Sequence, residues 1–281
     1  MHRSLIVLPS QKIALFVREH GEGFPILIMH GGLGADHSTM LALLPLSDAY
    51  RLIFYDHRCN GRSEKADIST MTWDNLCADA EALRSHFSLD KWAIVGHSFG
   101  GMIALEYAIR YPYRVSHLVL LDTGGDSSYV QEGAPIALRS RGFKETAVAL
   151  AKRFYNGDIN ANELKKSMLT LGRAYYSNPG IGFFLREVLR ALRIRANSDA
   201  FIYGSKVLLS GWNVMDQLAS ISSPTLIVAG CDDFLWPPGH QRELKQGIAE
   251  AQLHLLTGAG HMAHIEQSEK VIGLIRDFVR F

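Results

Sequence analysis

The chain has 281 residues, of which 47% are hydrophobic and 20% are charged, and its 29 basic and 28 acidic residues leave a net charge of +1. This length allows one large or two modest domains with a substantial core, and the composition is that of an ordinary globular protein. The near balance of charge predicts neither a nucleic-acid partner nor a membrane partner.

Three cysteines, Cys59, Cys77 and Cys231, are too few and too widely spaced for a disulfide framework or a zinc ribbon. We therefore expect free thiols in a reducing compartment. The apolar run Leu5 to Leu8 is interrupted by Pro9, so it is too short for a signal-peptide core or a membrane span. Together these features predict a cytoplasmic location.

Short β-branched and apolar runs predict the strands. The first two, at 5–8 and 13–18, are separated by Pro9-Ser10-Gln11-Lys12 and predict an antiparallel hairpin at a sheet edge. Further strands are predicted at 25–29, 51–55, 92–95, 117–121, 225–229 and 253–256. Because fully apolar strands alternate with helical stretches, we predict an α/β protein with a mostly parallel sheet of about eight strands and helices on both faces.

The alternation of strands and helices stops between Leu121 and Thr225. The residues there follow a helical pattern and include many aromatic side chains, namely Phe143, Phe154, Tyr155, Tyr175, Tyr176, Phe183, Phe184, Phe201, Tyr203 and Trp212. We predict an inserted helical cap at 125–215, between two parts of the core at 1–124 and 216–281. Most of these aromatic side chains are expected to pack the cap helices together, and the rest to line a pocket.

The segment Gly96-His97-Ser98-Phe99-Gly100 lies between the predicted strand 92–95 and a helical run at 102–108. A sharp turn from strand to helix exposes and orients a serine, and glycines on either side give the helix room to fold back against the strand. Ser98 is therefore the predicted nucleophile.

The loop His30-Gly31-Gly32-Leu33-Gly34 follows the predicted strand 25–29. In a parallel sheet such loops surround the ligand site, and their backbone N–H groups can stabilise an oxyanion. We predict that Gly32 and Phe99, the residue after the nucleophile, supply these two donors. A flexible loop or a phosphate cradle are the alternatives, although no Gly-Lys-Ser/Thr follows the loop.

The acid and the base are expected in loops after later strands. Asp232 and Asp233 follow the strand at 225–229, and Asp122 ends an earlier strand, so the residues alone leave three candidates for the acid. His261 follows the strand at 253–256 and is the predicted base. Serine, acid and histidine then occur in the order typical of one serine-hydrolase arrangement.

His261 and His264 have a spacing that could hold a metal ion, but no third ligand is evident. A serine nucleophile needs neither a metal nor a cofactor, so we predict no metal site and no cofactor. His97 is expected to be packed or hydrogen-bonded rather than reactive.

Together these residues resemble the α/β-hydrolase superfamily over nearly the whole chain. Three pieces resemble its branch of proline iminopeptidases and their esterase and lactonase relatives: the loop at 30–34, Asp56-His57-Arg58-Cys59-Asn60-Gly61-Arg62-Ser63, and Gly230-Cys231-Asp232-Asp233 with Pro237. In that family the acid stands three residues after the glycine and four before the proline, so the resemblance implies Asp233 as the acid. It also implies that Asp56 and Arg58 organise the loop near the oxyanion site.

Two features depart from the peptidase pattern. Leu33 stands where the family's loop usually has proline, and Trp212 is followed by Asn213 rather than by the glutamate that helps many of these peptidases to hold the substrate's amine. Four cap glutamates, Glu132, Glu145, Glu163 and Glu187, could still supply a carboxylate.

The leading hypothesis is a cofactor-free serine hydrolase that cleaves a small carboxylic ester or lactone. The first alternative is an aminopeptidase of the proline iminopeptidase type. A hydrolase of carbon-carbon bonds and a noncatalytic ligand-binding protein are further alternatives. A dehalogenase or an epoxide hydrolase would carry aspartate in place of Ser98. The sequence predicts no oligomeric state.

Overall fold

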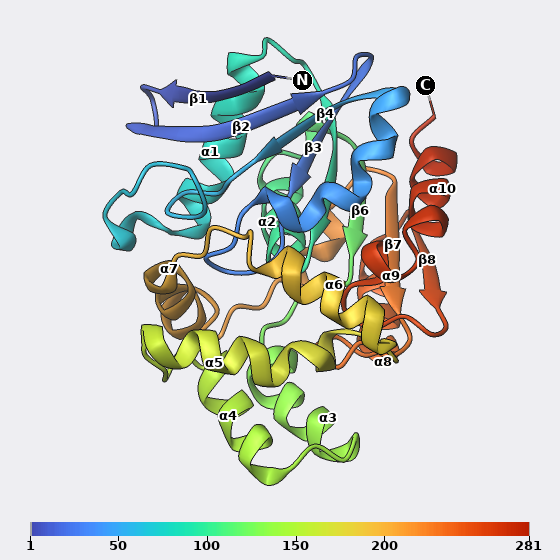
Figure 1. Cartoon of the computed structure of the whole chain (residues 1–281). Helices are drawn as coiled ribbons and strands as arrows, with labels where there is room; N and C mark the ends of the chain where they lie inside the picture. Colours follow the sequence, from blue (N-terminus) through green and yellow to red (C-terminus); the bar gives the residue numbers. More distant parts are fainter. Residues whose placement is uncertain (1, 281) are drawn as a thin grey trace.

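The computed structural model describes residues 2–280 and contains one eight-stranded sheet (Figure 1). The strands are β1 (His2–Leu8), β2 (Ile13–His20), β3 (Phe24–Met29), β4 (Tyr50–Tyr55), β5 (Trp92–His97), β6 (Val115–Leu121), β7 (Thr225–Gly230) and β8 (Ala251–Leu256). Their order across the sheet is β1-β2-β4-β3-β5-β6-β7-β8. All the predicted strands are present, and several extend one to three residues further than the apolar pattern indicated.

The sheet is mostly parallel, as predicted. β1 and β2 form the antiparallel hairpin at one edge, and β2 pairs antiparallel with β4. From β4 to β8 every neighbouring pair is parallel. The carboxyl ends of the central strands therefore meet at one rim of the sheet, where the loops that carry the candidate residues begin.

Helices cover both faces of the sheet. One face packs against α1 (Trp73–His86), α2 (Phe99–Arg110) and α8 (Pro238–Gly247). The other packs against a 3₁₀ helix at His37–Asp48 and against α9 (Ala263–Glu266) and α10 (Ser268–Phe278). β3 shows the reason, because its successive buried side chains alternate between the two apolar clusters.

Between β6 and β7, residues 129–208 form helices, which we call the helical segment. It contains α3 (Ala134–Ser140), α4 (Glu145–Tyr155), α5 (Ala161–Leu171), α6 (Ile181–Ala191) and α7 (Ser198–Tyr203), with two short π-helices at Tyr129–Gly133 and Gly204–Leu208. An isolated antiparallel bridge between Asp126 and Asn213 joins the chain just before and just after this segment. Figure 1 shows it beside the carboxyl ends of the strands.

No helix within residues 2–280 is long and apolar enough to cross a membrane.

Candidate active site

Ser98 lies at the turn from β5 into α2, with φ +51° and ψ −121°. The turn is tight because both flanking glycines contact backbone. A Cβ on Gly96 would lie 2.6 Å from the carbonyl oxygen of Gly100, and a Cβ on Gly100 would lie 2.6 Å from the carbonyl oxygen of His30. Any larger residue would force strand and helix apart. Ser98 itself is only half-buried.

The structure brings Ser98, His261 and Asp233 together. Ser98 Oγ lies 3.0 Å from His261 Nε2, and His261 Nδ1 lies 2.9 Å from Asp233 Oδ2. Since a carboxylate only accepts, Nδ1–H donates to Asp233, and Nε2 is left to accept the hydroxyl proton of Ser98. His261 and Asp233 are almost fully buried. The three side chains have the relative positions of a nucleophile, a base and an orienting acid.

Asp233 is held by its own loop after β7. Its Oδ1 accepts the backbone N–H of Leu235 at 2.8 Å, which leaves Oδ2 for His261. Asp232 points elsewhere, because its carboxylate accepts the hydroxyl of Ser177 from the helical segment. Two adjacent aspartates therefore face different regions of the molecule.

Asp122, the third candidate acid, is fully buried at the end of β6. Its two carboxyl oxygens accept the backbone N–H groups of Gly230 at 2.8 Å and Ala263 at 3.0 Å. Burial, followed by the charge of Asp233, raises the pKa of Asp122 to about 8. Asp122 thus ties together the loops that carry Asp233 and His261.

The pKa of His261 is raised above its ordinary value. Burial alone would lower this pKa, but the charge of Asp233 and its hydrogen bond raise it more. Asp122 and Glu266 raise it further. Glu266 also accepts the N–H groups of Gly260 at 2.7 Å and of Ser177 at 2.8 Å. It therefore links the loop of His261 to the helical segment, a role that no sequence motif indicated.

The two predicted oxyanion donors belong to adjacent segments. Phe99 is the first residue of α2, so its N–H has no acceptor within the helix. Gly32 has a φ of +79° in the loop after β3, and this loop begins where Gly100 of α2 packs against the backbone of His30. The predicted loop is therefore next to the start of α2.

Asp56 links the segment that follows this loop to residue 62. One carboxyl oxygen accepts the backbone N–H of His37 at 2.8 Å and contacts its ring nitrogen at 2.6 Å, while the other accepts the N–H of Arg62 at 2.7 Å. Arg58 instead pairs with the buried Asp79 at 2.6 Å, so it anchors its loop to α1.

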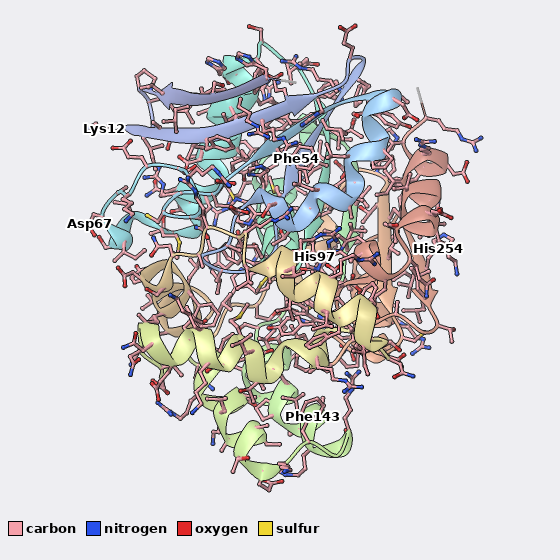
Figure 2. All side chains as sticks on the ribbon, viewed as in Figure 1. Lys12, Phe54, Asp67, His97, Phe143 and His254 are labelled. Carbon is pink, nitrogen blue, oxygen red and sulfur yellow. The ribbon has the colours of Figure 1, made fainter. Side chains whose placement is uncertain are left out.

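His97, Asp122 and His264 form a buried group whose potential ligand atoms all lie within 4.8 Å of one another. The sequence analysis did not recognise this set. His97 Nε2–H donates to the carbonyl of His261 at 3.0 Å, and His264 Nε2–H donates to the carbonyl of Thr39 at 3.2 Å. Burial lowers the pKa of both rings, that of His264 to about 4. The His97 ring therefore supports the backbone of His261 and the His264 ring supports that of Thr39, and Figure 2 labels His97 at the end of the sheet beside the helical segment.

Aromatic rings surround His261. The centroid of Tyr175, from the helical segment, lies 5.5 Å from that of His261, and the centroid of Trp236 lies 5.8 Å from it. The hydroxyl groups of Tyr175 and Tyr155 lie 2.9 Å apart. Tyr175 and Tyr155 were among the aromatic residues noted from the sequence, whereas nothing in the sequence indicated Trp236.

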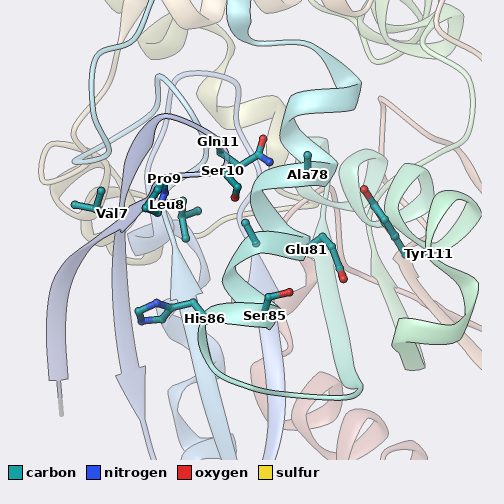
Figure 3. Close-up of a pocket in the computed structure, with 11 residues that line it drawn as sticks. Val7, Leu8, Pro9, Ser10, Gln11, Ala78, Glu81, Ser85, His86 and Tyr111 are labelled. Carbon is teal, nitrogen blue, oxygen red and sulfur yellow. The ribbon is translucent and has the colours of Figure 1, made fainter.

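Two surface cavities lie outside this cluster. One, of about 460 Å³, is bounded by the turn after β1 and by α1 (Figure 3). The other, of about 430 Å³, is lined by residues that include Trp73, Tyr203 and Trp212, and the rings of Trp73 and Trp212 stack on each other with centroids 5.1 Å apart. Neither is lined by Ser98, Asp233 or His261.

Comparison with known families identifies the fold. A family model described as "alpha/beta hydrolase fold" matches residues 25–268. The chain belongs to the α/β-hydrolase family. Its fold and family, predicted from the sequence, are thereby confirmed.

Known members resemble this α/β-hydrolase over nearly its full length. Proline iminopeptidase PfmaB from Pestalotiopsis fici is 30% identical over 263 residues, which are 91% of this chain and 92% of the relative. A 2-hydroxy-6-oxo-6-phenylhexa-2,4-dienoate hydrolase from Comamonas testosteroni is 28% identical over 278 residues, covering 93% and 90%. The solved structure of an esterase from Exiguobacterium antarcticum superposes with a TM-score of 0.79 at 20% identity over 98% of each chain. The relatives thus share the hydrolase class but differ in the bond they are named for.

Proposed function

We propose that this α/β-hydrolase is a serine hydrolase that cleaves a carboxylic ester or lactone through an acyl-enzyme on Ser98. The observation that carries the proposal is the pair of hydrogen bonds from Ser98 to His261 and from His261 to Asp233, at 3.0 and 2.9 Å. A serine becomes a competent nucleophile when a neutral imidazole accepts its proton and a buried carboxylate holds that imidazole in the correct tautomer.

The first half-reaction follows from these positions. His261 Nε2 takes the proton of Ser98 as Oγ bonds to the substrate carbonyl carbon, and the N–H groups of Gly32 and Phe99 stabilise the resulting oxyanion. The bond from carbon to the leaving oxygen then breaks, and His261 returns the proton to that oxygen. The leaving alcohol departs from an ester, whereas it stays attached to the acyl group of a lactone.

The second half-reaction regenerates the serine. Water loses a proton to His261 and attacks the acyl carbon, a second oxyanion forms, and Ser98 leaves with the proton that His261 holds. The carboxylate of Asp233 holds His261 in place and stabilises the imidazolium in each half-reaction. The products are a carboxylic acid and an alcohol, or a hydroxy acid from a lactone.

Residues 125–215 are proposed to act as a cap that selects the substrate. The segment contacts the catalytic loops at several points: for example, Tyr175 packs on His261, Ser177 bonds to Asp232, and Asn197 donates to the carbonyl of Gly34 at 2.7 Å. Substrate selection by such a segment leaves the reacting groups on the sheet unchanged.

An uncharged substrate fits this cap better than an amine. Of the four glutamates considered as amine ligands, Glu187 alone is buried. Its carboxylate is already contacted by Arg190 at 3.1 Å and by Arg186 at 3.4 Å. Two guanidinium groups neutralise the charge that an ammonium group would need. This favours the ester or lactone hypothesis.

An aminopeptidase is the second candidate. Its support is the 30% identity to a relative named as a proline iminopeptidase. A carbon-carbon bond hydrolase has similar support from the Comamonas relative. Parallel assays with p-nitrophenyl esters, lactones, prolyl anilides and a vinylogous diketone separate the three, because the proposal requires the highest kcat/KM on the oxygen esters.

Substitution of Ser98 tests the mechanism itself. Ser98→Ala should lower kcat by about four to six orders of magnitude and abolish labelling by a fluorophosphonate, while the thermal unfolding curve stays unchanged. A Ser98→Ala variant that keeps most of the esterase activity would exclude the acyl-enzyme. Failure of the wild-type protein to react with the probe would favour a noncatalytic member of the fold.

A further inference from the structure

Helix α6 exposes a row of large aliphatic side chains. Ile181 is 82% exposed, Leu185 57% and Leu189 62%, and Leu192, just after the helix, is 73% exposed. Their spacing of four, four and three residues places them on one face. We call these four residues the apolar stripe.

The inside of α6 is unusual in the opposite sense. Surface helices of globular proteins bury their apolar face, but the buried residue of α6 is Glu187, which is 4% exposed. One of its carboxylate oxygens has no hydrogen-bond partner. Of the residues of α6 that the structure describes, Glu187 is thus the fully buried one, beside the half-buried Phe183, Phe184 and Val188, while the leucines are exposed. An exposed apolar row of this kind marks a surface that binds a protein partner or a membrane.

Contacts at both ends hold α6 in this orientation. Before the helix, Ser177 donates its N–H to Glu266 at 2.8 Å, and after it the N–H of Asn197 donates to Gly34 at 2.7 Å. Glu266 lies beside the loop of His261, and Gly34 ends the loop of Gly32. α6 is thus fixed between the two loops that flank Ser98, and the side chains of the apolar stripe remain exposed.

Positive charge lies along one side of the apolar stripe. Residues 181–195 contain four arginines and one acid, Glu187, whereas the whole chain has a net charge of +1. Arg186 and Arg190 contact Glu187, but their side chains remain 66% and 46% exposed, and Arg193 is also exposed, so the single acid offsets only part of the positive charge. At 100° per residue these arginines follow Leu189 around the helix. An apolar row beside arginines is the pattern of helices that lie in the interface of a bilayer.

We propose that α6 docks the protein on the surface of an anionic phospholipid bilayer. The apolar stripe enters the boundary between headgroups and acyl chains, and the arginines contact lipid phosphates. A second copy of the chain would present the same positive charge to this face, so the charge favours lipid. Docking places the catalytic loops beside the bilayer. The inference does not depend on the proposed hydrolysis.

This inference departs from the sequence-based expectation of no membrane partner. That expectation rested on the charge of the whole chain, in which 28 acidic residues offset 29 basic ones. The charges near a helix decide how it meets a membrane, because exposed charges more than about 8 Å apart are largely screened from each other at physiological salt.

Vesicle binding tests the proposal with the full-length protein. Co-sedimentation is measured with phosphatidylcholine vesicles that contain or lack phosphatidylglycerol. The wild-type protein should bind the anionic vesicles, and Leu185→Ser with Leu189→Ser should lower the partition coefficient by about tenfold or more. Arg186→Gln with Arg193→Gln should lower it by about fivefold per arginine on anionic vesicles, with little change on neutral ones.

The matched control is Leu5→Ser with Val7→Ser on β1, where the side chains are 59% and 66% exposed. This pair removes a similar apolar area far from α6 and should leave vesicle binding unchanged. Equal losses from the α6 and β1 variants, or no wild-type binding to anionic vesicles, would overturn the proposal. So would wild-type dimerisation in ultracentrifugation that the α6 leucine variant abolishes, because a second copy would then cover the stripe.

Discussion

β5 and α6 both flank the candidate active site, but the side chains of β5 are buried and most side chains of α6 are not. All six residues of β5 are buried, including His97, whereas of the eleven residues of α6 only Glu187 is buried. A strand at the centre of the sheet is fixed by neighbours on both faces and at both edges. A helix that is held mainly at its ends has few such neighbours along its length. The packing of the sheet therefore fixes Ser98 independently of the packing of α6.

Substitution of the two adjacent aspartates tests whether the sheet and the helical segment have separate roles, because Asp233 faces His261 and Asp232 faces Ser177. Asp233→Asn should lower kcat by about 10⁴-fold, because an asparagine amide can donate to His261 Nδ1 and so favour the wrong tautomer. Asp232→Asn removes only the carboxylate that accepts from Ser177 in the helical segment and should change kcat less than about tenfold. Steady-state kinetics on one ester measures both.

Circular dichroism shows whether each aspartate variant remains folded. Equal losses of kcat in Asp232→Asn and Asp233→Asn would mean that the helical segment takes part in the chemistry. The division between the two regions would then fail.

Two glycines, one in α2 and one in α6, test how tightly each helix is packed. A Cβ on Gly100, in α2, would overlap the carbonyl groups of Met29 and His30, so Gly100→Ala should lower the free energy of unfolding by about 1–3 kcal/mol or more. Gly182, in α6, has no neighbour within 4 Å of a new Cβ. Gly182→Ala should leave stability unchanged or raise it by up to about 1 kcal/mol, because alanine favours a helix.

Urea denaturation monitored by tryptophan fluorescence gives both glycine values. Destabilisation of similar size in the two variants would show that α6 is packed as tightly as α2, against its observed exposure.

The sheet and the Ser98 turn could be predicted because their causes are local. Alternating burial on two faces makes β3 and β5 continuously apolar, and Gly96 and Gly100 mark the close approach of strand and helix. The choice between Asp233 and Asp232 was less local. Both follow β7, and the family spacing, rather than their own chemistry, selected the one that contacts His261.

The orientation of α6 could not be predicted, since the helical pattern of residues 181–191 shows an apolar face but not which way it turns. In the structure, α6 is oriented by hydrogen bonds from the N–H groups of Ser177 and Asn197 to Glu266 and Gly34, which are distant in the sequence. Glu266 was missed for the same reason, because its partners Gly260 and Ser177 meet it only in the folded chain. Tertiary contacts decide such positions, and no local propensity encodes them.

The smallest expected effect lies at Glu266, where the two regions meet. The base must be neutral to accept the proton of Ser98. As the pH is lowered, kcat/KM should therefore decrease, with an inflection at the pKa of His261. Because the charges of Asp233 and Glu266 raise this pKa, the inflection should lie above the ordinary histidine value of about 6.5. Glu266→Gln removes one of these charges, favours neutral His261 and should shift the inflection to lower pH by less than about one unit. A shift to higher pH in the kcat/KM profile would contradict the sign of this electrostatic effect, whereas a shift larger than one unit would mean that the link to Ser177 also positions His261.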